Sequence, residues 1–414
     1  MTATVSRSEF VKLVGVFAGS LALGVNLETR ASGAVAANGF VPDVWLQIDP
    51  NDAVTVTLNK SEMGQGVMTG LPTLIAEELD FPLERLRVTV AEAAPRYIYK
   101  GATRMTTGGS TSMRDSWLPL RRAGATARAM LVAAAAKRWS VDPAHLATEN
   151  GVVVDRATNR RATYGSLATL AATLPVPANV SLKDPSQFKL IGAASTRRLD
   201  IPAKVNGTAR FGMDVKVPGM HYAAIARSPV FGGKVRSFDA GKAKAIHGVL
   251  DAVEVPTGVA VIASNTWAAF QGRNALIVEW DEGPNVQLSS AELFAASERI
   301  GSDPAQWKIA LQRGHGVDDV HGAKTLEAIY RGPFLAHAAM EPENATAYVH
   351  DGICEVWAPT QAQRSARPRP RRLPDYRSRN ASSTRRCLAA GSGGVFSRTI
   401  SRKRSRSPTP SKRR

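Results

Sequence analysis

Hydrophobic and polar residues alternate over Val54–Leu58 and then recur at helical spacing over Leu71–Leu79, with Pro72 near the expected helix start. The first pattern predicts a half-buried strand, and the second predicts an amphipathic helix. The turn between them is Glu62–Gly66, in which Gln65 adds an amide that can donate and accept hydrogen bonds. Because glycines expose backbone N–H groups and a helix N-terminus favours negative charge, this unit suits an anionic ligand. The alternative is an ordinary tight turn that binds nothing.

A second small-residue loop, Met105–Ser112, precedes a long stretch of helical character from Trp117 to Trp139. The loop is either a second ligand cradle or a helix cap, since Ser and Thr are favoured at caps. Asp155–Pro185 follows and reads as a turn, a short helix and a linker.

From Arg198 onward, short strand-like segments separated by regular turns predict an α+β domain that ends near Gly283. The predicted strands are Phe211–Val215, His221–Ala226, Val249–Val255, Val259–Ala263 and Ala275–Trp280, with helices over Ala240–His247 and Thr266–Asn274.

A helix-rich link follows Gln287 and leads to an apolar run that contains His337 and Glu341. Pro342 and the strand-like Ala347–Val349 argue against a helix that would bring these two side chains to one face. His337 is more often a structural residue than a ligand. Glu341 is the stronger functional candidate, because a buried carboxylate requires a specific partner.

Composition changes this picture mainly through charge. At 414 residues, we expect about two or three domains. The formal net charge is +18, but Arg364–Arg414 alone holds 17 Lys and Arg residues and one acid, Asp375. The rest is nearly neutral, so nothing there indicates polyanion binding. The two cysteines, Cys354 and Cys387, are too few for an iron–sulfur cluster. Zinc, Walker and nucleophile-elbow motifs are absent, which argues against protein-nucleophile or zinc catalysis.

Residues 1–39 have the character of an export signal and a linker. A short polar lead precedes the apolar run Leu13–Val25, and Ser6–Lys12 resembles a twin-arginine motif with Ser8 at the second arginine position. If the signal works, the protein is periplasmic or membrane-associated, and otherwise it is cytoplasmic. The alternative is an amphipathic or buried N-terminal helix. No stretch is apolar for long enough to predict a secure transmembrane helix.

Several motifs in a fixed order resemble one protein family. They are EMGQG (Glu62–Gly66), AEELD (Ala76–Asp80), TGGSTS (Thr107–Ser112), ARFGMD (Ala209–Asp214), ARSPVFGGKV (Ala226–Val235), NTWAA (Asn265–Ala269) and HAAMEPENATA (His337–Ala347). From Phe40 to Gln363 the chain resembles the molybdenum-containing large subunit of the xanthine dehydrogenase and aldehyde oxidase family, in its isoquinoline 1-oxidoreductase β-subunit branch.

The resemblance implies an α+β fold in which a split molybdopterin-binding domain carries an inserted α/β-hammerhead domain. Residues 40–195 would form the first part of the molybdopterin domain, 196–285 the hammerhead, and 286–363 the start of the main molybdenum-binding domain. The cofactor would be molybdopterin cytosine dinucleotide with Mo. Its expected contacts are Gly64, Gln65, Gly66, Gly108, Gly109 and Ser110.

The resemblance also implies the chemistry. The family hydroxylates an aldehyde or N-heterocycle with oxygen from water, and Glu341 matches a position that faces the substrate pocket. Electrons would pass to a small [2Fe–2S] subunit and on to a cytochrome acceptor. No residue of this chain is expected to ligate the metal. The family's catalytic glutamate would lie beyond Gln363, so no catalytic residue is assigned.

The resemblance stops after Gln363. We interpret residues 364–414 as an out-of-frame translation, because a one-base shift at Ala389–Val395 can restore the family's Gly-Gly-Gly-Phe-Gly-Arg-Arg loop. We therefore expect a truncated subunit that is inactive as it stands. The alternatives are a non-catalytic, pseudogene-like fragment and a basic tail that binds nucleic acid. The composition of this tail predicts disorder in each case.

Overall fold

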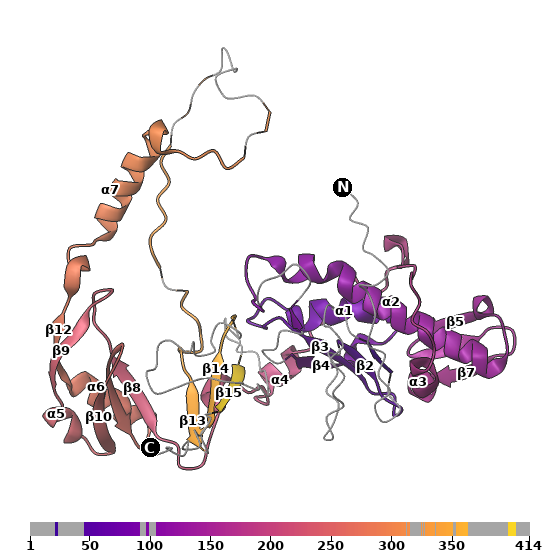
Figure 1. Cartoon of the computed structure of the whole chain (residues 1–414), viewed down its shortest axis with the longest axis horizontal. Helices are drawn as coiled ribbons and strands as arrows, with labels where there is room; N and C mark the ends of the chain where they lie inside the picture. Colours follow the sequence, from indigo (N-terminus) through magenta and orange to yellow (C-terminus); the bar gives the residue numbers. More distant parts are fainter. Residues whose placement is uncertain are drawn as a thin grey trace, which may run out of the picture. The chain divides into compact units, whose positions relative to one another are not determined.

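The computed structural model describes residues 21–23, 45–91, 97–98, 105–311, 313–314, 324, 326, 328–335, 337–350, 353–362 and 396–402. The chain divides into two compact units, Met1–Val215 with Ala339–Arg414, and Lys216–Ala338. Each unit combines helices with small sheets, in agreement with the mixed helix and strand content predicted (Figure 1). Among the described residues, no helix has the length and apolar character needed to cross a membrane.

A four-stranded sheet forms the centre of the first unit. Its strands are β1 (Leu21–Leu23), β2 (Leu46–Ile48), β3 (Val54–Leu58) and β4 (Arg87–Val90), in that order. β3 and β4 are parallel and are connected through helix α1 (Val67–Leu79), whereas the other pairs are antiparallel. Three residues of the predicted signal run thus form an edge strand. The rest of that run lies outside the described residues.

The alternating pattern of β3 is confirmed, because Val54, Val56 and Leu58 are fully buried while Thr55 and Thr57 are half-buried. α1 starts at Val67 rather than near Pro72, which lies inside the helix. A proline at that position removes one backbone donor from the helix. The helix start is therefore fixed by residues before it, as described below.

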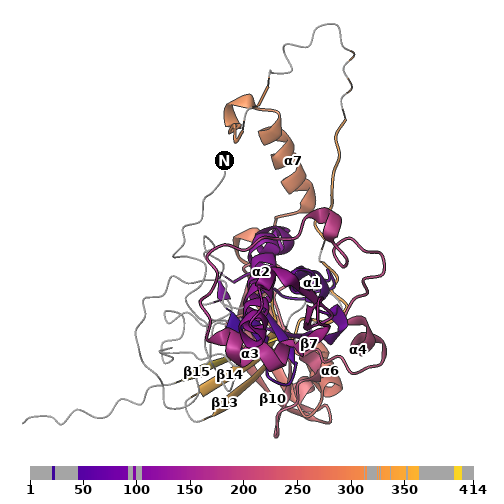
Figure 2. The same ribbon diagram turned by 90° about the vertical axis from the view of Figure 1, so that its right-hand side faces the viewer.

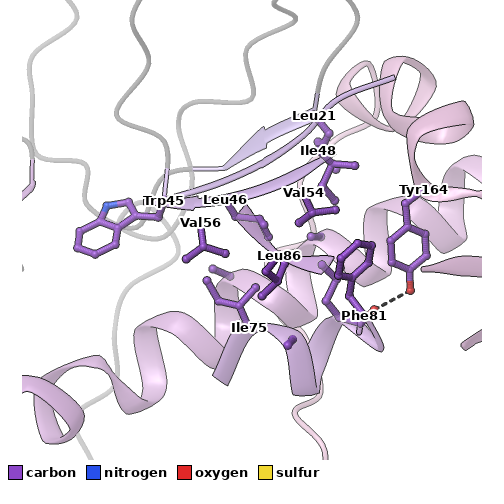
Figure 3. Packing of buried hydrophobic residues seen from close by; sticks show 14 of the residues in the cluster. Leu21, Trp45, Leu46, Ile48, Val54, Val56, Ile75, Phe81, Leu86 and Tyr164 are labelled. Atoms are coloured by element: carbon purple, nitrogen blue, oxygen red, sulfur yellow. Dashed lines mark hydrogen bonds between the residues drawn. The ribbon is translucent and has the colours of Figure 1, made fainter. Parts of the chain in front are cut away.

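The core of the first unit lies between this sheet and three helices. Trp45, Val54 and Ile75 contribute from the sheet side and α1, and Tyr164 contributes from α3 (Tyr164–Ala172) (Figure 3). The buried Tyr164 hydroxyl donates to the Leu79 carbonyl at 2.6 Å. Burial of each large apolar side chain is worth about 1.5–3 kcal/mol, so this cluster is the main source of stability for the unit.

Helix α2 (Thr111–Trp139) packs along α1 in both views (Figures 1 and 2). The helices approach closely at Gly124, where an added Cβ would lie 2.7 Å from the Ile75 carbonyl oxygen. The unit also contains a small antiparallel sheet of β5 (Leu146–Glu149), β6 (Val152–Asp155) and β7 (Arg160–Thr163).

A third sheet of this unit consists of β13 (Thr346–His350), β14 (Ile353–Pro359) and β15 (Phe396–Arg402). The prediction of disorder across residues 364–414 is therefore wrong for Phe396–Arg402. The edge of β14 offers a row of backbone N–H and C=O groups for pairing. The segment Phe396–Arg402 contains residues of high β-propensity, which favours an extended conformation at that edge. The rest of 364–414 lies outside the described residues.

The second unit contains a three-stranded sheet and a two-stranded ribbon. The sheet has the order β10 (Val249–Val255), β11 (Gly258–Ala263), β8 (Tyr222–Ala226), and the ribbon pairs β12 (Ile277–Asp281) with β9 (Lys234–Asp239). The helices are α5 (Gly241–Lys244), α6 (Thr266–Ala275) and α7 (Ser290–Gly301). Small side chains such as Ala224 and Ala268 let α6 pack closely on the sheet.

Two sequence predictions in this region need correction. β9 was missed, because its strand pattern begins directly after the turn at Gly232 and Gly233. The predicted strand Phe211–Val215 is wrong. The structure instead has a 3-10 turn over Gly212–Asp214, in which the Asp214 carboxylate accepts the Phe211 N–H at 2.7 Å. That local bond competes successfully with an extended backbone. A short helix, α4 (Ile201–Val205), precedes the turn.

Candidate functional site

Two helices begin side by side in the first unit. Near their starts, an added Cβ at Gly70 of α1 would lie 3.1 Å from the Met113 side chain of α2. Further along, Asp80 lies 3.7 Å from the Arg128 guanidinium. The helices therefore run in the same direction, and both N-termini lie at the same end. Ser61–Gly66, the first loop, leads into α1, and Met105–Ser110, the second loop, leads into α2.

The first loop is built around the side chain of Glu62, which is 1% exposed. Its carboxylate accepts the N–H groups of Gly64 at 2.8 Å, Gly66 at 2.9 Å and Met68 at 2.9 Å. Gly64 and Gly66 have φ values of 104° and 92°, which strongly favour glycine. Glu62 thus caps α1 from within the protein. Those three N–H groups point to this carboxylate and not outward.

Gln65 is exposed, but half of its amide shapes the loop. Nε2 donates to the Ser61 carbonyl at 2.7 Å, and Oε1 accepts the Met63 N–H at 2.7 Å. An amide has two donor hydrogens and two acceptor lone pairs, so one of each remains for a ligand.

The second loop is fastened to the first by Thr107, whose side chain is buried. Its hydroxyl accepts the Ser61 N–H at 2.7 Å. Its N–H donates to the Gln361 carbonyl at 2.8 Å, and the Gln361 side-chain amide returns a bond to the Thr107 carbonyl at 2.9 Å. The Ser61 hydroxyl also donates to the Thr360 carbonyl at 3.1 Å. Three segments far apart in the sequence therefore meet here.

A buried lysine contacts the second loop and adjoins the first. Lys60 directly precedes the first loop, is 6% exposed, and donates from Nζ to the Thr106 carbonyl at 3.0 Å. Burial lowers the pKa of the Lys60 amine, and the charge of Asp115 opposes that shift. An anionic ligand at the loops would favour the charged form of this amine.

Gly108, Gly109 and Ser110 lead directly into α2. Gly109 and Ser110 adopt left-handed conformations with φ of 62° and 54°, and the Ser110 side chain makes no capping bond. In the described part of the chain, no side chain accepts a hydrogen bond from the first-turn N–H groups of α2. A Cβ added at Gly108 would meet no atom within 4 Å. Within the described ranges, the first turn of α2 therefore has no side-chain cap, unlike the first turn of α1.

Glu341 lies elsewhere in the first unit, next to the Gly212–Asp214 turn. Its carboxylate accepts the Met213 N–H at 3.0 Å and the Asn344 amide at 2.9 Å. Within the described ranges, no hydrogen bond connects Glu341 to either loop. Its neighbourhood is linked to them through the end of β14, because a Cβ at Gly212 would lie 2.8 Å from Pro359, just before Thr360.

The AEELD motif is structural in this fold. Glu77 accepts the backbone N–H groups of Lys189, Leu190 and Ile191 at 2.7–3.1 Å, while Arg121 binds the fully buried Glu78 at 2.7 Å. Burial opposes ionisation of Glu77, but the three N–H donors hold its pKa below the usual range. Among the described residues, no group of three or more His, Cys, Asp or Glu side chains could hold a metal ion.

Sequence reasoning missed three residues that shape the site: Glu62, Thr107 and Arg198. Arg198 contacts the first loop from a position 134 residues away. The local signal for Glu62 was an acidic residue just before a helix start, which is a favoured place for a carboxylate. Thr107 and Arg198 act through long-range contacts that leave no local pattern.

Comparison with known proteins identifies the cofactor class. Residues 12–215 match a family model described as a molybdopterin cofactor-binding domain. The chain is 31% identical over 418 residues to isoquinoline 1-oxidoreductase subunit beta of Brevundimonas diminuta, covering 87% of this chain and 52% of that protein. It is 32% identical over 339 residues to the membrane-bound aldehyde dehydrogenase (pyrroloquinoline-quinone) of Gluconacetobacter polyoxogenes, covering 78% and 43%. The chain thus spans about half the length of these relatives.

Among solved structures, quinoline 2-oxidoreductase from Pseudomonas putida 86 matches with a TM-score of 0.25 and 22% identity, over 34% of this chain and 19% of that chain. This overlap is too small to establish a shared fold. The sequence matches carry the assignment, and by them the chain belongs to the xanthine dehydrogenase family of molybdopterin-binding large subunits.

Proposed function

We propose that the two loops form part of the molybdopterin site of a molybdenum-dependent oxidoreductase, which hydroxylates an aldehyde or an N-heterocycle with oxygen from water. The matched molybdopterin domain and the relatives named for isoquinoline and aldehyde oxidation support this class. When bound, the molybdenum cofactor supplies the centre for the two-electron oxidation.

The observation that carries the proposal is the uncapped N-terminus of α2, which lies beside the first loop. Phosphate groups suit a helix N-terminus whose N–H groups have no side-chain cap. The empty space at Gly108 leaves room for such a group against the backbone. The residues present therefore fit an anionic cofactor. The N–H groups at Gly108, Gly109 and Ser110 would hold its phosphate, and the free half of the Gln65 amide would bind a polar edge.

The finer assignments rest on the family resemblance. They include the cytosine dinucleotide form of the cofactor, a small [2Fe–2S] partner subunit, a cytochrome acceptor and the absence of nucleic-acid binding. We assign residues 196–285 to a hammerhead domain and Glu341 to the substrate side. Export to the periplasm rests on residues 1–39, nearly all of which lie outside the described residues.

The second candidate is a polypeptide of residues 1–414 that holds part of the cofactor site without catalysing turnover. It spans about half the length of its relatives. We expect it to show no turnover of aldehydes or N-heterocycles with an artificial electron acceptor. Stoichiometric molybdenum together with turnover by this polypeptide would contradict that expectation. Molybdenum without turnover would support a part of the cofactor site that is not sufficient for catalysis.

The direct test compares Gly108→Ala with Gly301→Ala. Both glycines have open space for a Cβ and neither needs a positive φ, but Gly301 lies in α7. The proteins are produced with a molybdenum cofactor supply, and molybdenum and acid-released CMP are quantified. We expect Gly108→Ala to lose about tenfold in cofactor affinity, or about 1.4 kcal/mol, and Gly301→Ala to match the wild type. Equal molybdenum in all three proteins would contradict the assignment of the second loop. Molybdenum without CMP would contradict the dinucleotide form.

A further inference from the structure

The first loop is held by two side chains, those of Glu62 and Arg198. Glu62 binds it from the inside through three N–H groups, as described above. Arg198 binds it at the next peptide group, where Nη1 donates to the Gly64 carbonyl at 2.8 Å. Nη2 of the same guanidinium lies 3.4 Å from the Glu62 carboxylate. We call these two residues and their contacts the Glu62–Arg198 clamp.

Asp200 fixes the direction of the Arg198 guanidinium. Nε donates to Oδ1 at 2.9 Å and Nη2 donates to Oδ2 at 2.7 Å, which is the two-bond fork that a carboxylate forms with arginine. Lys204 donates to the same Oδ2 at 2.6 Å. The neighbouring backbone is fixed as well, because the Leu199 N–H donates to the Thr69 hydroxyl in the first turn of α1 at 2.9 Å. Because Nε and Nη2 of Arg198 are bound to Asp200, Nη1 is the nitrogen that is directed to the Gly64 carbonyl of the first loop.

The clamp sets the orientation of two successive peptide groups. The N–H of Gly64 points to Glu62, and the carbonyl of Gly64 points to Arg198. Because a trans peptide places its N–H opposite its carbonyl, the N–H of Gln65 points away from Arg198. Gly64 and Gly66 both keep positive φ in this arrangement. The clamp therefore determines the side on which the loop presents Gln65.

We propose that Glu62 and Arg198 are positioning residues for the cofactor, and that their clamp holds the first loop in the conformation that presents Gln65. The identity of the ligand as a molybdopterin cofactor rests on the proposed function. The clamp itself is independent of it, so the two can be tested separately.

The first experiment measures hydrogen–deuterium exchange in the protein without cofactor. Arg198→Ala and Arg198→Lys are compared with Arg197→Ala, which removes the adjacent, exposed arginine. We expect the amides of Gly64, Gly66 and Met68 to exchange about tenfold faster in Arg198→Ala, with the later turns of α1 unchanged. Arg198→Lys restores part of the protection, because it keeps the charge but loses the fork. Unchanged loop exchange, or faster exchange throughout the unit, would overturn the clamp. If Arg198→Ala does not fold, Asp200→Asn provides the milder change and the same readout.

The second experiment loads this chain with molybdenum cofactor and measures how long it retains molybdenum after dilution. We expect Arg198→Ala to release the cofactor several-fold faster than the wild type, with Arg198→Lys between them and Arg197→Ala unchanged. Equal retention in Arg198→Ala, despite faster loop exchange, would overturn the positioning role. A wild type that never takes up molybdopterin would overturn the proposed function and the cofactor part of this inference, while the exchange result would still stand.

Discussion

The hydroxyl of Thr107 accepts a hydrogen bond from the N–H of Ser61 at 2.7 Å and thereby joins two loops that are 46 residues apart. Both residues are buried, and Thr107 is also bonded through its own backbone to Gln361. The two loops of the candidate site thus share one buried junction. A change at Thr107 should affect both of them.

Replacement of Thr107 by valine keeps the shape of the side chain but removes the acceptor. The Ser61 N–H is then buried without a partner, which costs about 1–3 kcal/mol. We expect Thr107→Val to lower the free energy of unfolding by that amount in urea titrations, and Thr107→Ser to stay close to the wild type. A loss in Thr107→Ser with none in Thr107→Val would show that the methyl group, and not the hydroxyl, matters.

The buried pair of Arg121 and Glu78 is the strongest stability test of the AEELD motif. Their side chains are 7% and 0% exposed and lie 2.7 Å apart. Arg121→Met leaves a buried carboxylate without this partner, so we expect a loss of about 3–5 kcal/mol by chemical denaturation. The double variant Arg121→Met, Glu78→Gln should recover part of the loss. A double variant that is no more stable than Arg121→Met would contradict the pairing.

Asp200 should make stability depend on pH in the acid range. Burial raises the pKa of Asp200, but hydrogen bonds from Arg198 and Lys204 outweigh it and lower the pKa from 3.8 to about 2. A carboxyl with a depressed folded-state pKa stabilises the fold above its unfolded pKa and loses that contribution as the pH falls through the folded value. The stability difference between the wild type and Asp200→Asn should therefore shrink between pH 4 and pH 2. A constant difference over this range would contradict the shifted pKa.

Replacement by alanine should lower stability at one glycine of the site and cofactor binding at another. Gly66 has a φ of 92°, so Gly66→Ala should cost about 1–2 kcal/mol of stability from backbone strain. Gly108 has open space and no positive φ, so Gly108→Ala should leave the thermal midpoint unchanged while it weakens cofactor binding. Thermal melts of the cofactor-free protein separate the two effects. A large loss of stability in Gly108→Ala would mean that this loop is structural.

The sequence pattern predicted elements whose side chains alternate or recur locally. β3 and β10 have the predicted bounds. The bounds of β3 follow from its period-two burial. The start of α1 was misplaced, because Glu62 and not Pro72 determines it. The junction at Gln361 and the contact of Arg198 with Gly64 span 254 and 134 residues. Hydrogen bonds between residues so far apart in the sequence leave no periodic pattern. The two loops could therefore be predicted, but the residues that hold them in place could not.

β14 has one further consequence. It pairs with β15 through backbone N–H and C=O groups along seven residue pairs, from Ile353 opposite Arg402 to Pro359 opposite Phe396. Backbone pairing of this kind depends on an extended conformation and only weakly on which side chains are present. The edge of β14 therefore acts as a sequence-tolerant template. The same strand continues into Thr360 and Gln361, so whatever segment occupies that edge is connected within one short run of chain to the second loop.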